Sequence, residues 1–213
     1  ARSWEAVRPG VTELEVFSDV ARACTEAAGQ PVVVYGDFCS GPRTWIERGG
    51  PPTERRLERG DLMILDFSVV IGGYRGDFTN TIAVGSQPTT EQRRLFELCR
   101  AALSAGEGAI CHDASARDVF ETLTLQLTQA DPALRLTGHG GHGIGLAHPE
   151  SPIIVPRSTD RLQAGDVITL EPGAYVEGVG GMRFEHNYLV TPDGCERLTN
   201  HVVGLTRGQA ETI

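Results

Sequence analysis

The chain contains no lysine, because all 19 of its basic residues are arginine. This absence excludes a Schiff-base mechanism and a lysine general base. Its five cysteines form no CxxC pair and are odd in number, which favours free thiols in a cytoplasmic protein over a disulfide framework. No apolar run approaches the ~18 residues of a membrane span, so no membrane partner is expected. The net charge of −9 lacks the basic footprint of a nucleic-acid-binding protein.

The length of 213 residues, 40% of them apolar, is enough for one sizeable core. No linker or low-complexity segment divides the chain, so residues 1–213 are expected to form a single domain. The chain begins at Ala1 rather than at a methionine, close to an amphipathic segment. We therefore expect that an N-terminal domain is absent from this chain.

An internal repeat is the most informative feature that is present. The segment from Arg56 to Asp66 resembles the segment from Arg161 to Glu171, 105 residues later. Upstream of each copy, residues 7–17 resemble residues 110–120 at an offset of 103. Solenoid repeats run only ~20 to 50 residues, so this period indicates a duplicated half-domain. The pseudo-repeats are expected at about 7–105 and 110–200.

Hydrophobic periodicity and turn signals predict the secondary structure. Helices are expected over 13–28 after a Thr12 capping box, over 89–106 with Thr90 as the cap, and over 115–130. Strands are expected at 31–35, 62–71, 78–84, 153–155, 167–170, 174–176 and 188–190. This order predicts an α+β fold with helices outside a curved, mainly antiparallel sheet.

Four acids lie in the repeated hairpins. Asp66 stands in a strand that is apolar on both faces, where burying an unpaired carboxylate costs on the order of several kcal/mol. A tight loop at Ile71-Gly72 would set Asp66 opposite Asp77, and the second hairpin offers Glu171 and Glu185. One such acid alone would favour a salt bridge to arginine or a solvent-facing position. Four acids in two related hairpins favour a metal centre.

The expected nitrogen ligand lies in the glycine-rich segment from Thr137 to Leu146, where glycine permits close backbone approach. One imidazole with four carboxylates suits a pair of Mn, Co, Fe or Zn ions rather than a structural zinc site. Two such ions lower the pKa of a shared water, which makes hydroxide available near neutral pH. The predicted reaction class is hydrolysis.

These motifs resemble the pita-bread metallopeptidases, a family that includes prolidase, Xaa-Pro aminopeptidase, methionine aminopeptidase and the non-peptidase creatinase. The resemblance covers essentially the whole chain, and the spacing before Glu185 is most similar to that of prolidases and Xaa-Pro aminopeptidases. The motifs that carry it are Leu65-Asp66-Phe67 with Asp77, Gly141-His142-Gly143-Ile144-Gly145, Leu170-Glu171-Pro172-Gly173 and Arg183-Phe184-Glu185.

The resemblance implies a pita-bread fold of two pseudo-twofold-related halves and two divalent metal ions, with Mn favoured. It implies that Asp66 holds one ion, that His142 and Glu171 hold the other, and that Asp77 and Glu185 bridge the two. Glu171 would also relay the proton of the attacking water.

The resemblance further implies that Arg183 and His148 contact the substrate, and that His148 supports the tetrahedral intermediate. His139 is a candidate for a substrate contact or for a position behind the ligands, and a loop histidine hydrogen-bonded to the backbone is the alternative. Two departures concern the substrate: residues 43–50 contain no histidine, and His148 stands one place earlier than in prolidases. For the remaining histidines, surface positions are expected for His112 and His201, and a position outside the ligand shell for His186.

The leading hypothesis is a cytoplasmic dinuclear metallohydrolase that cleaves peptide bonds preceding proline, with a proline-containing peptide as its substrate. A second hypothesis is a creatinase-like enzyme acting on a small amide, amidine or sulfonium compound, favoured by the histidine-free loop. A third is an inactive binding module, which the complete ligand set disfavours. A homodimer is left open.

Overall fold

The computed structural model describes residues 2–134, 136 and 138–207. Thr137, the first residue of the predicted glycine-rich segment, lies outside them. The first half contains α1 (Arg2–Ala6), α2 (Glu13–Ala28), β1 (Val33–Ser40), α3 (Arg43–Ile46), β2 (Leu62–Ile71) and β3 (Tyr74–Ala83). The second half begins with the helices α4 (Thr90–Glu107) and α5 (Ala116–Ala130). Its strands are β4 (Gly141–Gly143), β5 (Glu150–Ile154), β6 (Val167–Leu170), β7 (Gly173–Val176), β8 (Gly180–Arg183), β9 (His186–Val190) and β10 (Cys195–Arg197).

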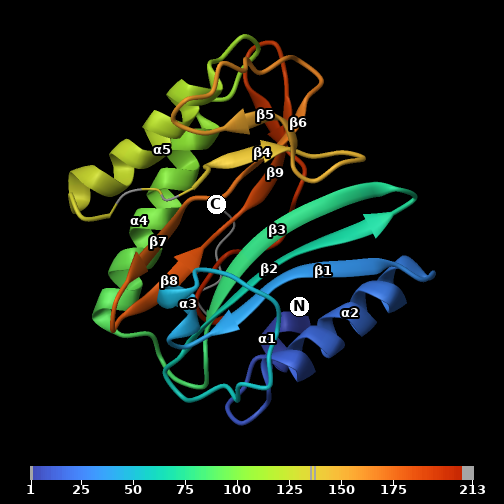
Figure 1. Cartoon of the computed structure of the whole chain (residues 1–213), viewed down its shortest axis with the longest axis vertical. Helices are drawn as coiled ribbons and strands as arrows, with labels where there is room; N and C mark the ends of the chain where they lie inside the picture. The colour runs from blue at the N-terminus through green and yellow to red at the C-terminus, as the bar shows by residue number, and fades with distance from the viewer. Residues whose placement is uncertain (1, 135, 137, 208–213) are drawn as a thin grey trace.

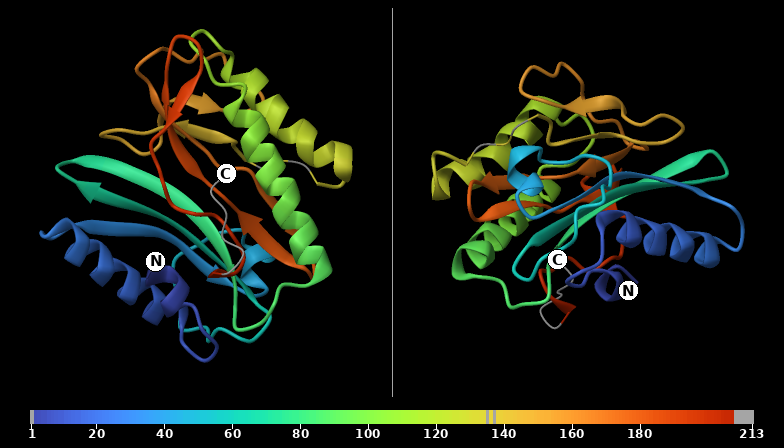
Figure 2. Two further views of the ribbon diagram at one scale, coloured as in Figure 1. Left: turned by 180° about the vertical axis from the view of Figure 1, so that it is seen from behind. Right: turned by 60° about the horizontal axis from the view of Figure 1, so that its bottom comes forward.

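The strands form antiparallel sheets, with helices on the outside. One sheet has the order β1-β2-β3, a second has the order β10-β9-β6-β4-β5, and β7 pairs with β8. Helix α2 lies along the outer side of the first sheet, and α4 and α5 cover the second sheet on its far side (Figure 1). The two sheets therefore face each other across the middle of the molecule, as Figure 2 shows from behind. This is the α+β arrangement that the sequence predicted.

Hydrogen bonds at corresponding positions confirm that the two halves are related. Thr12 forms a β-bridge with Arg56, and Ser115 forms one with Arg161. Thr12 and Ser115 are also the N-caps of α2 and α5, each accepting a hydrogen bond from the backbone three residues later. The offsets equal those of the sequence repeat, so both copies keep the same connection between helix cap and hairpin.

The register of the first hairpin differs from the prediction. The loop consists of Gly72 and Gly73, so that Asp66 pairs with Thr79 and Ser68 pairs with Asp77. The prediction that Asp66 faces Asp77 directly was wrong because it placed the loop one residue too early. A shift of two positions along a strand preserves the face. Asp66 and Asp77 are therefore diagonal neighbours on one face of the sheet.

Strand β1 extends through Ser40, whereas the sequence predicted a loop from Gly36. Gly36 and Asp37 are poor strand formers, which explains the wrong boundary. At Gly36 a Cβ atom would lie 2.1 Å from the carbonyl oxygen of Asp66, so only glycine allows β1 and β2 to approach this closely. The extra strand length places Asp37 in register with Asp66.

Helix caps agree with the sequence at α2 and α5 and differ at α4. Thr12 forms the predicted capping box with Glu15. The N-cap of α4 is Thr89, which forms a capping box with Gln92, so the prediction of Thr90 was wrong by one residue. Two threonines in sequence offer the same side-chain oxygen, and the glutamine three residues after Thr89 decides between them.

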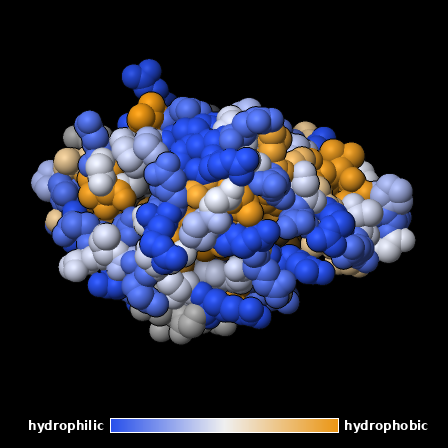
Figure 3. Space-filling model, turned by 90° about the horizontal axis from the view of Figure 1, so that it is seen from below, coloured by the Kyte–Doolittle hydropathy of each residue, from blue (hydrophilic) through white to orange (hydrophobic). Residues whose placement is uncertain are grey.

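Two hydrophobic clusters support the sheets from outside. One lies between α4, α5 and the second sheet, and the other lies between α1, α2 and the first sheet. Seen from below, most of the surface is hydrophilic and apolar side chains are scattered between polar ones (Figure 3). Among the helices that the structure describes, none combines the length and apolar character needed to span a membrane.

Candidate active site

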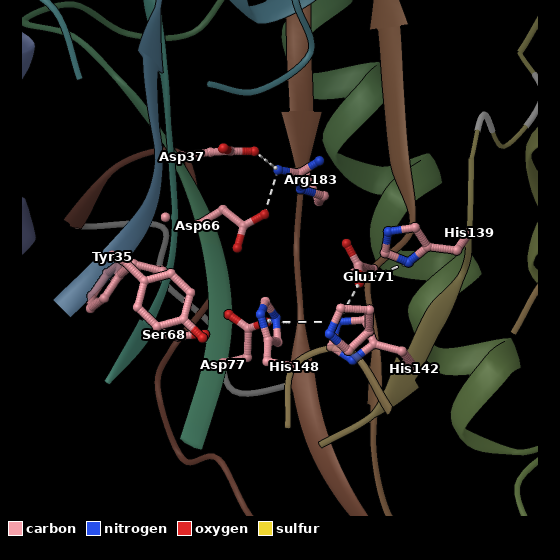
Figure 4. A pocket seen from close by; sticks show the side chains of 13 residues that line it. Tyr35, Asp37, Asp66, Ser68, Asp77, His139, His142, His148, Glu171 and Arg183 are labelled. Atoms are coloured by element: carbon pink, nitrogen blue, oxygen red, sulfur yellow. Dashed lines mark hydrogen bonds and ion pairs between the residues drawn. The ribbon is translucent and has the colours of Figure 1, made fainter. Parts of the chain in front are cut away.

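The predicted metal ligands converge between the two sheets (Figure 4). Asp66 lies on β2 and Asp77 on β3, whereas His142, Glu171 and Glu185 come from the second half. A cavity of about 310 Å³ is lined by four of these residues, and Glu185 is fully buried outside that lining. Ligand atoms lie within 4.8 Å of one another in three overlapping groups: Asp66, Asp77 and Glu185; His142, Glu171 and Glu185; and Asp77, His142 and His148.

Glu185 gives the clearest indication of a missing positive charge. The residue is fully buried, and its Oε2 accepts a hydrogen bond of 2.7 Å from the Thr79 hydroxyl. Its Oε1 is buried and has no hydrogen-bond partner among the described residues. Burial raises the pKa of Glu185 well above its ordinary range, and the nearby Asp77 adds to that shift. A cation beside Oε1 would remove both penalties.

Asp66 is in a similar position but has a cationic neighbour. Burial raises the pKa of Asp66 to about 7, and Asp77 acts in the same direction while Arg183 opposes them. Arg183 forms a short ion pair with Asp66. The alternative to a metal ligand, a buried acid paired with arginine, therefore applies in part to Asp66. It does not apply to Glu185.

His142 is oriented as a metal ligand. Its Nδ1 lies 2.9 Å from the carbonyl oxygen of Gly143, which assigns the proton to Nδ1. Its Nε2 then presents a lone pair toward Glu171 Oε1 at 3.5 Å and Asp77 Oδ2 at 3.8 Å. Burial lowers the pKa of His142, although Glu171 acts against this effect, so the ring is held neutral. A neutral imidazole beside carboxylates is the donor set that Mn, Co, Fe and Zn bind.

Arg183 joins residues from three strands. Its guanidinium contacts Asp66, lies 3.0 Å from Asp37 Oδ2 and donates to the Tyr175 hydroxyl at 3.3 Å. Burial works against its charge, but Asp66, Tyr175 and Glu171 together outweigh this effect and raise the pKa of Arg183, which stays a permanent cation. Arg183 and Asp37 both line the cavity.

Sequence reasoning missed Asp37. An acid within a β-branched strand was the signal that identified Asp66, and the same signal was present at Asp37 after Val32-Val33-Val34-Tyr35. It was overlooked because Gly36 was interpreted as the end of that strand.

The two further predicted site histidines both line the cavity and contact acids. His148 Nε2 lies 2.5 Å from Asp77 Oδ2, and His139 Nδ1 lies 3.2 Å from Glu171 Oε1. The hydrogen bond to Asp77 raises the pKa of His148, and the bond to Glu171 raises the pKa of His139. The one-residue displacement of His148 in the sequence thus still leaves its ring at the cavity.

The remaining histidines lie away from the cavity lining. His186 contacts the Thr199 hydroxyl at 2.8 Å and belongs to none of the three ligand groups, as expected. His112 is exposed, as expected. His201 was expected at the surface, and this was wrong: its ring lies 4.4 Å from the ring of His186 and 5.1 Å from that of Phe78. The segment after β10 folds back over β9, a tertiary contact that no local pattern predicts.

The second acids of the two hairpins do not occupy corresponding positions. In the first half the Val84 N–H donates to the carbonyl oxygen of Asp61, and in the second half the Val190 N–H donates to that of Asp166. Val84 therefore corresponds to Val190, so the return strands of the two hairpins correspond at an offset of 106 residues. The counterpart of Asp77 is therefore Arg183, and the counterpart of Glu185 is a threonine, Thr79. Asp66 and Glu171 do correspond, at an offset of 105.

Comparison with known proteins shows the family of this chain. The model of metallopeptidase family M24 matches residues 1–192. An uncharacterized peptidase of Staphylococcus saprophyticus is 30% identical over 200 residues, covering 92% of this chain and 55% of the relative. Uncharacterized peptidases of Staphylococcus aureus show the same identity and coverage. The chain thus spans about half the length of the curated relatives it matches.

Solved structures give the same result. An Xaa-Pro dipeptidase from Bacillus anthracis superposes with a TM-score of 0.89 at 30% identity, over 96% of this chain and 57% of that chain. A prolidase from Pyrococcus horikoshii has a TM-score of 0.87 at 28% identity, over 93% and 57%. An X-Pro aminopeptidase from Thermotoga maritima has a TM-score of 0.89 at 25% identity, over 96% and 57%. The pita-bread fold is thereby confirmed.

Proposed function

The chain belongs to metallopeptidase family M24, and on this premise we propose that it is the catalytic part of a dinuclear metallohydrolase that cleaves peptide bonds preceding proline. The observation that carries the proposal is the convergence of four carboxylates and one imidazole on a cavity with an unpartnered, buried Glu185 oxygen. The preference for proline rests on likeness to proteins described as Xaa-Pro dipeptidase and X-Pro aminopeptidase.

The five residues divide naturally between two divalent cations. Asp66 would bind one cation, and His142 and Glu171 would bind the other, while Asp77 and Glu185 would contact both. The acid-rich set contains a single imidazole, which favours manganese among the divalent ions. When bound, such ions supply Lewis acidity for a carbonyl group and lower the pKa of water.

The side chains around the cations have separate tasks in this proposal. Glu171 accepts a proton from the attacking water and returns it to the leaving nitrogen, because its carboxylate lines the cavity and is already hydrogen-bonded to His139. His148 donates a hydrogen bond to the developing oxyanion, because its ring lines the cavity beside Asp77. Arg183 holds Asp66 and Asp37 in place from the opposite wall.

A hydrolysis assay tests the proposal. The manganese-loaded protein is expected to cleave Xaa-Pro dipeptides or Xaa-Pro-Xaa tripeptides, and Glu185→Gln is expected to lose both activity and bound metal. Glu177→Gln is the matched control, because Glu177 is exposed in the β7–β8 turn and should change neither. A metal-loaded wild-type protein that leaves every peptide of the panel intact would contradict the proposal.

One observation supports a second candidate, a creatinase-like enzyme acting on a small amide, amidine or sulfonium compound. The segment 43–50 is described in full, contains no histidine and contributes no residue to the cavity lining. Asp37, from the preceding strand β1, does line the cavity, and its carboxylate suits a cationic group on a small substrate. Turnover of such compounds without turnover of Xaa-Pro peptides would favour this candidate.

A further inference from the structure

Arg75, near the tip of the β2–β3 hairpin, reaches across the cavity mouth to the other half of the molecule. Its backbone nitrogen donates to the carbonyl oxygen of Gly145 at 3.0 Å. Its Nε donates to the carbonyl oxygen of Leu146 at 3.1 Å. Both acceptors belong to the segment 144–148, which carries His148 and follows β4. Two hydrogen bonds from one arginine thus fix this segment to β3.

The same guanidinium also contacts Tyr35, a residue of the first half that lines the cavity. Arg75 Nη1 donates to the Tyr35 hydroxyl at 3.0 Å, and Arg75 Cζ lies 5.8 Å from the centre of the Tyr35 ring. The Tyr35 ring in turn meets the His148 ring edge to face at 5.7 Å, and both line the cavity. Arg75 therefore contacts both the segment that carries His148 and the side chain that packs against its ring.

Besides Arg75, the His148 ring itself joins this segment to the first half through its contact with Asp77 at 2.5 Å. Ile144 is buried, but the side chain of Leu146 is 64% exposed, so residues 145–148 gain little from apolar burial. Within it, Ala147 donates to Glu150 Oε2 at 2.9 Å, which shapes the turn without joining it to the first half. Segments with few buried apolar contacts open at low free-energy cost, so hydrogen bonds to Arg75 carry more weight here than in a packed core.

We propose that Arg75 is a positioning residue, which holds His148 at the distance from Asp77 at which its ring can serve the reacting bond. The proposal rests on the proposed function for its kinetic effect. Arginine suits this task because its planar group presents several donors in fixed directions, and a lysine ammonium cannot reproduce them. Replacing the Arg75 side chain would keep the backbone hydrogen bond to Gly145 but remove the bonds to Leu146 and Tyr35, which would loosen the segment and let the His148 ring sample positions away from the cavity.

Kinetics of Arg75→Gln on the metal-loaded protein test this idea. The expected result is a loss of kcat by about 10- to 100-fold with KM changed less than about threefold, because His148 acts on the transition state. Arg75→Lys should fail to restore kcat, and Tyr35→Phe should lower it by about threefold. Arg161→Gln is the matched control, since Arg161 donates to a backbone carbonyl at 2.6 Å in an exposed position of the other half.

A double-mutant cycle separates positioning from a general loss of structure. In a His148→Ala background, Arg75→Gln is expected to cost less than about twofold, because the group that it positions is gone. The same fold-loss in both backgrounds would overturn the proposal, as would an unchanged kcat in Arg75→Gln.

Hydrogen exchange gives a readout that does not depend on the substrate. Amides of residues 145–148 should exchange at least about tenfold faster in Arg75→Gln than in wild type or Arg161→Gln, with the exchange of β6 unchanged. If the wild-type protein cleaves no Xaa-Pro peptide, the proposed function fails while this measurement still decides whether Arg75 holds the segment. Unchanged exchange in Arg75→Gln would reject the positioning role.

Discussion

Removing divalent cations should make the stability of the protein fall as pH rises from about 6.5 to 8. The pKa of Asp66 rises from 3.8 to about 7 in the folded protein, and that of Glu185 rises well above its ordinary range. Between the unfolded and folded pKa values, the folded state therefore holds protons that the unfolded chain has released. The free energy of unfolding decreases with pH wherever the folded state binds more protons. Stability from Asp66 is thus greatest below pH 3.8 and is lost as pH approaches 7.

The magnitude follows from the shift of Asp66. A shift from 3.8 to about 7 corresponds to roughly 4 kcal/mol of folding free energy. For a chain of this length that equals about 8 to 16 °C in the midpoint of thermal unfolding. Glu185 acts in the same direction, as do His139 and His148, whose raised pKa values mean that stability is lost as pH rises through them. The pKa of Glu171 is lowered, and burial lowers the pKa values of His142, His186 and His201, so these groups oppose the trend, but only below about pH 6.5.

Thermal unfolding measured from pH 4.5 to 8.5, with a chelator and with manganese, checks this expectation. The metal-free protein should lose thermal stability toward alkaline pH, and manganese at about 100 times its Kd should add about 2.7 kcal/mol at pH 8. Asp66→Asn should flatten the dependence of the metal-free protein, because an amide does not titrate. A metal-free midpoint that stays constant or rises between about pH 6.5 and 8 would refute the view that these acids lack a counter-charge.

Three further substitutions test separate parts of the structure. Thr79→Val removes the hydrogen bond to Glu185 and should weaken manganese binding by about tenfold in a chelator competition, with little change in the metal-free unfolding midpoint. Gly141→Ala should prevent folding, as judged by circular dichroism, because the added Cβ would lie 1.9 Å from a carbonyl oxygen of β6 and because Gly141 has a φ of +149°. Gly178→Ala places its Cβ in open space and should cost only about 1 kcal/mol. Glu13→Gln should cost about 3 kcal/mol in urea unfolding without changing metal content, because this fully buried carboxylate accepts hydrogen bonds from two backbone and two hydroxyl groups and pairs with an arginine.

Features that depend on local chemistry were predictable from the sequence. The cap at Thr12 follows from its side-chain oxygen and the glutamate three residues later, and α2 begins directly after it. Asp66 was identifiable because apolar residues on both sides of it leave its carboxylate without water. Features that depend on the position of a loop to within one residue were not predictable from the sequence. Placing the β2–β3 loop one residue early changed the partner of Asp66, although the face survived because strand side chains alternate.

Features that depend on distant segments were also beyond local patterns. The two histidines that stack at 4.4 Å, His186 and His201, meet only because the C-terminal segment folds over β9. Asp37 becomes a site residue only through its contact with Arg183, 146 positions away in the chain. Neither contact has a signature within a window of the sequence, because propensity and periodicity report neighbours along one element.

The differences between the two halves explain why both are needed for the site. At corresponding positions the first hairpin carries Asp77 and Thr79, and the second carries Arg183 and Glu185. Each of these residues makes its contact across the boundary between the halves. Thr79 donates to Glu185, Arg183 pairs with Asp66, and His148 contacts Asp77.

The backbone follows the same pattern. Glu185 donates its N–H to the carbonyl oxygen of Thr79, and the Thr81 hydroxyl exchanges two hydrogen bonds with the backbone of Arg183. Identical copies would place like side chains against each other around the pseudo-twofold axis, where like charges would repel each other. Divergence at these positions replaced that repulsion with an acid–arginine pair and an acid–hydroxyl pair. Neither half contains all five candidate ligands or the residues that support them, so the site forms only where the two sheets meet, and a cation bound there would stabilise that arrangement over an opened one.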